Sequence, residues 1–213
     1  MPRHDPPGTA TRDTIRRKIS ASRLGRTPDQ RQSDDLARDA RVLELIGSLA
    51  PEGSVVACYL SRPGEPGTLS LVGQLADRYR VLVPRIGPLP DGGARRQPDW
   101  AWLSSPDELV EGLFGIPEPP GEGLGAEALG QADLVVAAAI DAGLDGSRIG
   151  TGGGWFDRAL LHRRPGVPVV VLLNDDEVRP CPQEPHDQPV DWLVTPTRTI
   201  RTQTAWCEPR DGT

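Results

Sequence analysis

A glycine-rich stretch at residues 148–158 carries the side chains best suited to chemistry. It reads Arg-Ile-Gly-Thr-Gly-Gly-Gly-Trp-Phe-Asp-Arg, so guanidinium groups flank it and a carboxylate lies near its end. Glycines allow positive φ and let several backbone N–H groups approach one ligand. Arginines suit phosphate oxygens, and a carboxylate beside them suits Mg²⁺ bridging to phosphate. The stretch therefore predicts a phosphate-binding loop, with a flexible turn as the alternative.

Apolar runs on both sides of this loop predict the elements that hold it. Residues 134–140 and 168–173 read as short buried strands, and residues 159–161 continue a helix that begins in the loop. The N-terminus of that helix would add unpaired N–H donors. Known nucleotide loops fit poorly, because the only lysine, Lys18, lies far upstream and Trp155 interrupts the Rossmann glycine spacing.

Two further groups of residues have spacing that permits binding. Arg12 and Arg16 lie four apart on a predicted helix over residues 11–24, as a solvated basic face or as a clamp on phosphates. Glu65 follows a predicted parallel strand at residues 54–60, at the sheet edge where α/β proteins bind ligands. An isolated glutamate there is more often a surface residue.

The remaining periodicity predicts an α/β chain. Residues 28–50 form an amphipathic helix, residues 69–77 a helix capped by Thr68, and residues 79–84 a strand. Residues 100–103 alternate like an antiparallel edge strand, and residues 191–194 read as the final strand.

Composition limits the class of protein. We expect one domain over residues 11–205 of the 213, with a disordered tail at 1–10 and a second tail at 206–213. The net charge of −6 argues against binding to nucleic acid or anionic membranes, and no apolar run is long enough to span a membrane. Three cysteines without a C-x-x-C pattern favour a reduced, cytoplasmic setting.

The glycine-rich stretch also resembles a family signature. Residues 148–157 are similar to the R-L-G-x-G-x-G-Y-Y-D sequence of the 5-formyltetrahydrofolate cyclo-ligase (5,10-methenyltetrahydrofolate synthetase) family. Four other segments resemble that family in the expected order: residues 12–16, 60–68, 115–119 and 186–195. Trp155 and Phe156 depart from it, because they replace the usual tyrosine pair.

This resemblance implies a three-layer α/β fold of the NagB/RpiA-like type, with a mostly parallel sheet and crossover helices. It implies ATP- and Mg²⁺-dependent cyclisation of 5-formyltetrahydrofolate to 5,10-methenyltetrahydrofolate, with ADP and phosphate released. The oligomeric state stays open, with a monomer favoured, and the expected location is the cytoplasm. The alternatives are a degenerate cyclo-ligase-like module that binds a nucleotide or a protein, and another ATP-dependent enzyme on the same scaffold.

The resemblance also implies roles for individual residues. Arg148 and Asp157 would be catalytic, and Asp157 and Asp191 would hold Mg²⁺. Leu60, Glu65 and Trp155 would bind the reduced folate. His186 and Asp187 stay open between catalysis and a turn-forming role. The residues expected to bind ATP are Arg12, Arg16, Arg148, Ile149, Gly150, Thr151, Gly152, Gly153, Gly154, Trp155 and Phe156.

Overall fold

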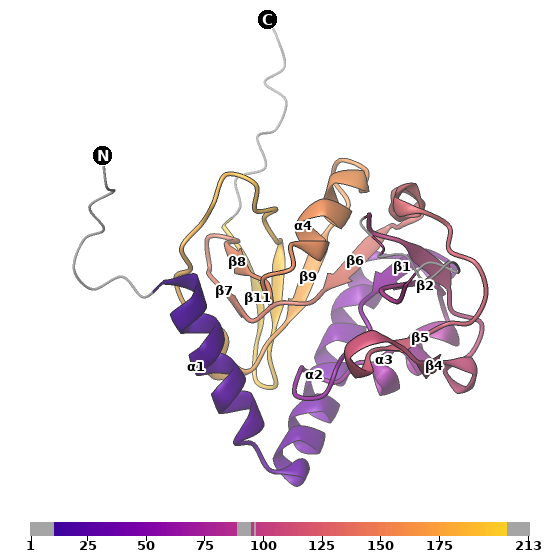
Figure 1. Ribbon diagram of the computed structural model, residues 1–213. Coiled ribbons are helices and arrows are strands. Elements are labelled where there is room, and N and C mark those ends of the chain that lie inside the picture. Colours follow the sequence, from indigo (N-terminus) through magenta and orange to yellow (C-terminus); the bar gives the residue numbers. More distant parts are fainter. Residues whose placement is uncertain (1–10, 89–94, 96, 204–213) are drawn as a thin grey trace, which may run out of the picture.

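A computed structural model describes residues 11–88, 95 and 97–203 of the chain. Its centre is a seven-stranded sheet in the order β11-β10-β9-β6-β1-β2-β3 (Figure 1). The tails predicted at 1–10 and 206–213 lie outside the described residues, so the domain boundaries remain predictions.

Five central strands of the sheet are parallel. They are β1 (Val55–Cys58), β2 (Arg80–Pro84), β6 (Leu134–Ala137), β9 (Val169–Leu172) and β10 (Trp192–Val194). The edge strands β3 (Trp100–Trp102) and β11 (Thr199–Arg201) are antiparallel to their neighbours. β1, β6 and β9 are buried along their whole length, which explains their continuous apolar sequences. The predicted mostly parallel α/β sheet is confirmed.

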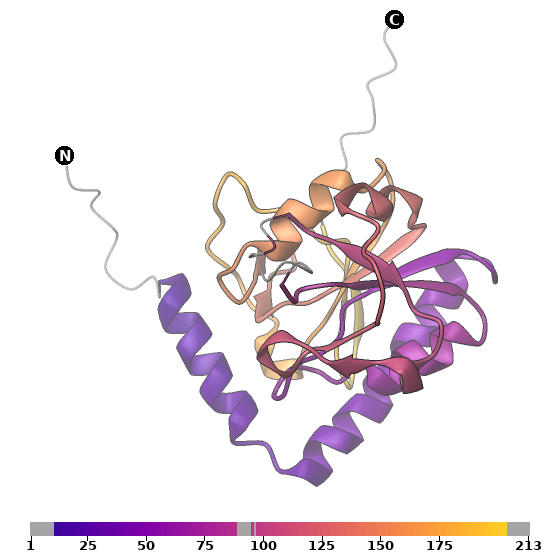
Figure 2. The same ribbon diagram turned by 45° about the vertical axis from the view of Figure 1, so that its right-hand side comes forward.

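Helices cover both faces of the sheet, giving three layers (Figures 1 and 2). α2 (Pro28–Leu49) packs against α3 (Leu69–Ala76) and begins with a capping box between Thr27 and Gln30. The 3₁₀ helices η3 (Ala126–Gln131) and η4 (Leu160–His162) contact each other, and η4 continues α4 (Trp155–Ala159). The chain steps from β1 to β2 in one direction and from β6 to β9 in the other, so right-handed crossovers put α3 and α4 on opposite faces.

The other elements are short, except α1 (Arg12–Leu24), which diverges from α2 and lies near the β7/β8 hairpin (Figure 1). That hairpin consists of β7 (Asp141–Ala142) and β8 (Arg148–Ile149). A second ribbon pairs β4 (Val110–Glu111) with β5 (Pro117–Glu118), and the remaining 3₁₀ helices are η1 (Pro106–Glu108), η2 (Leu113–Gly115) and η5 (Asp175–Glu177).

Three local predictions need correction. The strand predicted at 134–140 ends at Ala137, and the β7/β8 hairpin separates it from the glycine loop. Asp145 causes the reversal, because its Oδ1 accepts hydrogen bonds from the Ser147 backbone and hydroxyl. β11 follows the strand predicted to be last. Thr68 precedes α3 without capping it, because its hydroxyl accepts from the Ser61 N–H instead.

Two apolar clusters hold the fold. The main core lies around the sheet and includes residues of α2, α3 and α4. A separate, smaller cluster joins α1 to the β7/β8 hairpin through Ile15, Ile19, Ile140, Ile149 and Cys181. None of the helices in the described ranges has the length and apolarity needed to cross a membrane.

Candidate active site

A cavity of about 360 Å³ opens at the carboxyl ends of β1, β2 and β6. The chain leaves β1 towards β2 and later continues from β6 towards β9, so the strand order reverses between β1 and β6. At such a switch point the connecting loops diverge and leave a crevice. Leu60 after β1, Pro84 at the end of β2 and Ala138 after β6 line this cavity. The topology therefore places the candidate site where open α/β sheets bind ligands.

The glycine loop between β8 and α4 forms one wall of this cavity. Gly152 and Gly154 adopt φ of 106° and 63°, which side chains rarely tolerate. A Cβ at Gly150 would lie 3.0 Å from Arg148 Nη1, so a side chain would crowd the guanidinium. α4 has only five residues, so its dipole is small, and the N–H groups of the loop and of the first turn of α4 are the available donors.

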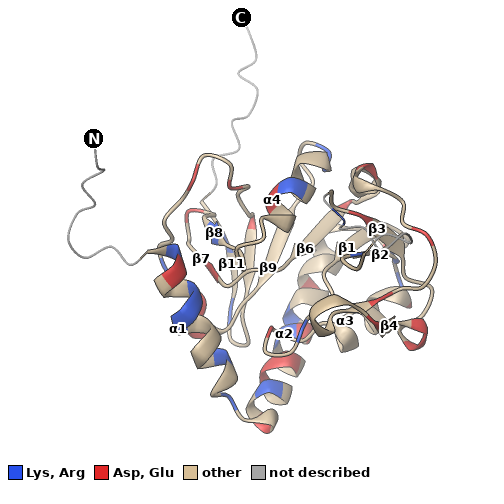
Figure 3. Cartoon of the chain, viewed as in Figure 1, with Lys and Arg blue, Asp and Glu red and all other residues tan. Residues whose placement is uncertain are grey.

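Arginines from three elements, α1, β8 and α4, surround the loop. Arg16 on α1 donates from Nε to the Gly150 carbonyl at 2.9 Å, although 134 residues separate them. Arg148 is buried and pairs with Asp157. Arg158 is exposed and donates to the Gly153 carbonyl at 3.0 Å. Figure 3 shows basic residues along α1 and on α4.

Asp187 is the carboxylate that the sequence left without a role. Arg12 donates to both of its oxygens, at 2.7 and 3.1 Å, and Asp187 also accepts from the Glu184 N–H at 2.8 Å. Burial alone would raise the pKa of Asp187, but these hydrogen bonds and the charge of Arg12 outweigh it and lower the pKa. Asp187 therefore combines a turn-forming role with a place in the site, whereas His186 is exposed.

Asp157 and Asp187 share one electrostatic environment. Burial lowers the pKa of Arg148, while the charges of Asp157 and Asp187 oppose that effect. The same two carboxylates help to raise the pKa of Arg12 against the desolvation that would lower it. The N–H of Gln188, next to Asp187, also points to Asp157 Oδ1 at 3.5 Å. The two acidic groups thus converge on the same pair of arginines.

Asp191 does not join this group, which corrects the predicted Mg²⁺ pair. It immediately precedes β10, and a residue before a parallel strand lies at the amino edge of the sheet, away from the carboxyl edge. Its Oδ2 accepts from the Val169 N–H at 2.7 Å, and the residue lines a different hollow with Leu49 and Trp192. Asp157 and Asp191 therefore lie in separate surroundings.

The predicted folate-side residues meet in the cavity wall. Leu60, Glu65 and Trp155 all line it. Arg62 holds Glu65 through two contacts. The guanidinium Nε of Arg62 lies 3.0 Å from Glu65 Oε1, and the backbone N–H of Arg62 donates to Glu65 Oε2 at 3.2 Å. Trp155 packs edge-on against Phe156 at 4.8 Å between ring centroids.

The structure adds apolar lining residues that the sequence did not single out. Phe114 is exposed, adopts a φ of 59° and lines the cavity together with Ile86 and Ile116. The available signal was the segment around residues 115–119, which resembled the family without suggesting a contact. The cavity therefore combines a wall of glycine-loop backbone and arginines with an apolar wall.

The residues present fit a magnesium-bound triphosphate. Arg12 Nε and Arg148 Nε are buried without a hydrogen-bond partner, so donors remain for an anion. Across the described part of the chain, no group of three or more His, Cys, Asp or Glu side chains could hold a metal by itself. Two carboxylates with phosphate and water oxygens are a usual environment for Mg²⁺.

Fold and site together define an α/β protein with a glycine-rich, arginine-flanked loop at the switch point of its sheet. A model of the 5-formyltetrahydrofolate cyclo-ligase family matches residues 8–196. The 5-formyltetrahydrofolate cyclo-ligase of Mycolicibacterium smegmatis is 31% identical over 189 residues, covering 86% of this chain and 96% of that protein. The chain belongs to the 5-formyltetrahydrofolate cyclo-ligase family.

Other relatives agree with this assignment. The 5-formyltetrahydrofolate cyclo-ligase of Escherichia coli K12 is 27% identical over 183 residues, covering 84% of this chain and 97% of that protein. The solved 5,10-methenyltetrahydrofolate synthetase of Aquifex aeolicus has a TM-score of 0.73 at 24% identity, covering 95% of this chain and 94% of its own. The latter similarity supports the fold.

Proposed function

We propose that this protein catalyses the ATP- and Mg²⁺-dependent cyclisation of 5-formyltetrahydrofolate to 5,10-methenyltetrahydrofolate, as a cytoplasmic monomer. The observation that carries the proposal is the convergence, on one cavity, of a glycine loop, the arginines 12, 16 and 148, and the carboxylates 157 and 187. Family membership supplies the substrate, because the named relatives are cyclo-ligases acting on 5-formyltetrahydrofolate.

The reaction requires activation of a poor electrophile. The formamide oxygen of the substrate is a poor leaving group, so N10 cannot displace it directly. Transfer of the γ-phosphoryl group of ATP to that oxygen releases ADP, and attack by N10 at the formyl carbon then expels phosphate. Donors aimed at the charge that develops on the transferring phosphoryl group accelerate such a step.

The nucleotide would lie along the glycine loop. N–H groups of residues 150–154 would bind phosphate oxygens, and Arg16 is poised there because it already contacts Gly150. Arg148 would exchange part of its pairing with Asp157 for phosphate, and its unpaired Nε is a further donor. Ile149 is buried behind the loop, where its contribution is to hold the backbone in place. Phe156 supports the loop by packing edge-on against Trp155.

Asp157 and Asp187 would hold Mg²⁺, in place of the pair with Asp191. The ion would supply charge neutralisation to the phosphates. The side chains around it have their own tasks: Arg12 and Arg148 keep the two carboxylates oriented before the ligand arrives. Folate would occupy the apolar wall, between Leu60 and Trp155, with Glu65 accepting hydrogen bonds from its polar edge.

An absorbance assay for methenyltetrahydrofolate, with and without ATP and Mg²⁺, tests the proposal. Product should form only when both are present. Asp157→Asn and Asp187→Asn should each lower turnover by about 100-fold or more, the scale on which loss of one transition-state contact acts. Asp191→Asn is the matched control and should keep turnover within about threefold.

The outcomes separate the alternatives. ATP binding without product would indicate a degenerate module, and ATP hydrolysis driven by a different acceptor would indicate another enzyme on this scaffold. A loss of turnover in Asp191→Asn equal to that in Asp187→Asn would contradict the metal assignment.

A further inference from the structure

α1 carries two of the proposed ATP-binding arginines but is not built into the main core. Its buried apolar residues, Ile15 and Ile19, belong to the small five-residue cluster on the β7/β8 hairpin. No residue of α1 belongs to the main core around the sheet. Figure 2 shows the helix extending along the side of the molecule, apart from α2. Apolar packing alone therefore fixes α1 only weakly to the rest of the molecule.

The polar contacts in the first half of α1 cannot serve as permanent anchors. Arg12 is held by Asp187, and Arg16 is held by the carbonyl of Gly150. Both partners belong to the proposed nucleotide and Mg²⁺ site, where a bound ligand competes for the same groups. A different part of the helix has to fix its position.

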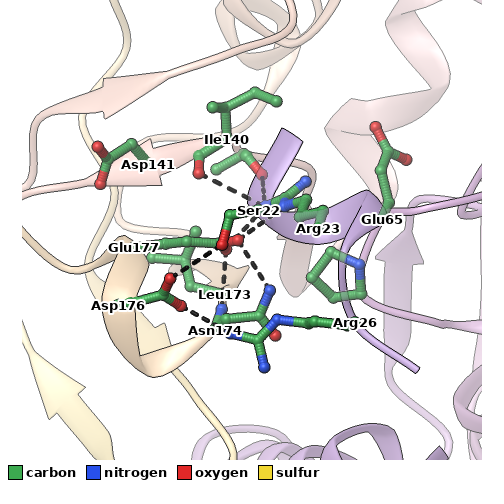
Figure 4. A network of polar contacts seen from close by, with 12 residues as sticks. Ser22, Arg23, Arg26, Glu65, Ile140, Asp141, Leu173, Asn174, Asp176 and Glu177 are labelled. Atoms are coloured by element: carbon green, nitrogen blue, oxygen red, sulfur yellow. Dashed lines mark hydrogen bonds and ion pairs between the residues drawn. The ribbon is translucent and has the colours of Figure 1, made fainter. Parts of the chain in front are cut away.

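The C-terminal end of α1 provides that fixed point, as Figure 4 shows. Arg23 and Glu177 form a two-pronged pair with both distances at 2.8 Å, and their side chains are 4% and 1% exposed. Arg23 Nη2 also donates to the Ala139 carbonyl at 2.9 Å. Glu177 in turn accepts from the backbone and side-chain amides of Asn174, and Arg38 of α2 donates to Asn174 Oδ1 at 2.8 Å.

This network joins α1 to the segments that follow two neighbouring strands of the sheet. Ala139 follows β6 and Asn174 follows β9, so Arg23 and Glu177 connect α1 to the carboxyl edge of the sheet. Glu65, on the proposed folate side, acts electrostatically on Arg23, and both residues line a small polar hollow beside α1. Burial would lower the pKa of Arg23, but Glu177 outweighs it and keeps the pKa raised, so Arg23 stays charged.

We propose that Arg23 is a positioning residue which, through Glu177, anchors α1 so that Arg12 and Arg16 are pre-organised over the glycine loop. The proposal rests on the proposed ATP-dependent function. The anchor orders the helix before the nucleotide arrives, and the ordering cost is therefore removed from the binding step. Buried pairs are not in general more stabilising than apolar residues of similar size, which makes a positioning role testable apart from stability.

The test replaces both partners with Arg23→Met and Glu177→Met, so that no unpaired charge remains buried. The KM for ATP should rise by about tenfold or more while kcat changes by less than about threefold, because pre-organisation acts on binding. The matched control removes an exposed pair far from the site, Arg78→Met with Glu52→Met, and should leave both constants unchanged.

Hydrogen exchange provides a readout independent of activity. In the double variant, amides of residues 12–24 should exchange faster without nucleotide and regain protection with a non-hydrolysable ATP analogue, while those of β6 and β9 stay as in the wild type. Equal acceleration in helix and sheet would mean that the pair has only a structural role. Unchanged exchange in residues 12–24 with an unchanged KM would also overturn the proposal.

Two further measurements distinguish failure of the anchor from misfolding of the variant and from failure of the proposed function. If the double variant does not fold, Arg23→Lys replaces it, because lysine keeps the charge but loses the two-pronged geometry. This variant should show a KM for ATP and a rate of amide exchange in α1 between those expected of the double variant and those of the wild type. Wild-type values of both would overturn the proposal. If the wild type forms no methenyltetrahydrofolate, the proposed function fails, while α1 exchange in the variant still tests the anchor.

Discussion

Arg16 shows how one side chain can connect two distant parts of the chain at the site. Its Nε donates to the Gly150 carbonyl, and its Nη1 pairs with Asp13 at 2.7 Å on the exposed side of α1. The guanidinium is thus oriented over the loop by one contact within the helix and one across the fold. The neighbouring Arg17 is exposed and makes only a 3.4 Å contact to the Asp13 carbonyl of its own helix.

This difference predicts unequal effects of two adjacent substitutions. Arg16→Ala should weaken ATP binding by about 1.5–3 kcal/mol, the scale of a hydrogen bond to a charged group. Arg17→Ala has the same change in charge and helix propensity and should leave the affinity within about 0.5 kcal/mol. Isothermal titration calorimetry with ATP and Mg²⁺ measures both. Equal weakening in the two variants would mean that general charge, and not the clamp, is responsible.

At the scale of elements, the glycine loop depends on particular backbone conformations. Gly152 has a φ of 106°, and a Cβ there would lie 3.6 Å from the Arg16 guanidinium carbon. Gly153 has no positive φ, and nothing lies within 4 Å of a Cβ added to it. Because the two glycines are adjacent, comparing their alanine variants distinguishes the effect of backbone strain from the effect of replacing a loop glycine.

We therefore predict that Gly152→Ala and Gly153→Ala differ in stability. Gly152→Ala should lower the free energy of unfolding by about 1–2 kcal/mol, the cost of forcing a side chain into this region of φ. Gly153→Ala should change it by less than about 0.5 kcal/mol, because alanine fits its backbone and the space is open. Urea denaturation of both variants measures the difference. A larger loss in Gly153→Ala would contradict the loop geometry described here.

Elements with clear periodicity were predictable from the sequence. α2, β1, β6 and β9 follow from amphipathic or continuous apolar patterns, and the edge strand β3 follows from alternation. The β7/β8 hairpin was not predictable from the sequence, because a strand of two residues is too short to show a repeating pattern. Residue types, and then the family resemblance, identified the glycine loop as more than a turn, whereas periodicity did not.

The site was predictable in part for similar reasons. Leu60 and Glu65 line one cavity with Arg148 and Trp155, although the two pairs lie far apart in sequence. Choosing between Asp187 and Asp191 required the three-dimensional structure, because both stand in the same family-like segment. One clue was present: Asp191 is the first residue of the strand predicted at 191–194, and the first residue of a parallel strand lies at the amino edge of the sheet.

For the whole molecule, the charged groups buried beneath α1 link stability to pH. Asp141 is fully buried, and this burial raises its pKa to about 7. The charges of Arg179 and Arg23 oppose the rise and that of Glu177 adds to it. Arg179 Nε lies 2.8 Å from Asp141 Oδ2, but neither atom has hydrogen-bonding geometry, so the close ion pair does not fully offset burial.

The sign of the effect follows from proton binding. An aspartate in the unfolded chain has a pKa of about 3.9. Between that pH and about 7, native Asp141 holds a proton that the unfolded chain has released. Raising the pH through this range therefore favours unfolding, and the contribution of Asp141 to stability is lost as pH approaches and passes 7.

Asp141→Asn should remove this dependence, because an amide does not titrate. Between pH 5 and 8 the wild type should lose on the order of 2 kcal/mol more stability than the variant, about half of what a three-unit pKa shift could supply. Asp39, whose burial raises its pKa to about 6, titrates in both proteins and so cancels in the comparison. Urea denaturation across this pH range measures the two slopes, and parallel slopes would show that Asp141 is ionised in the native protein throughout.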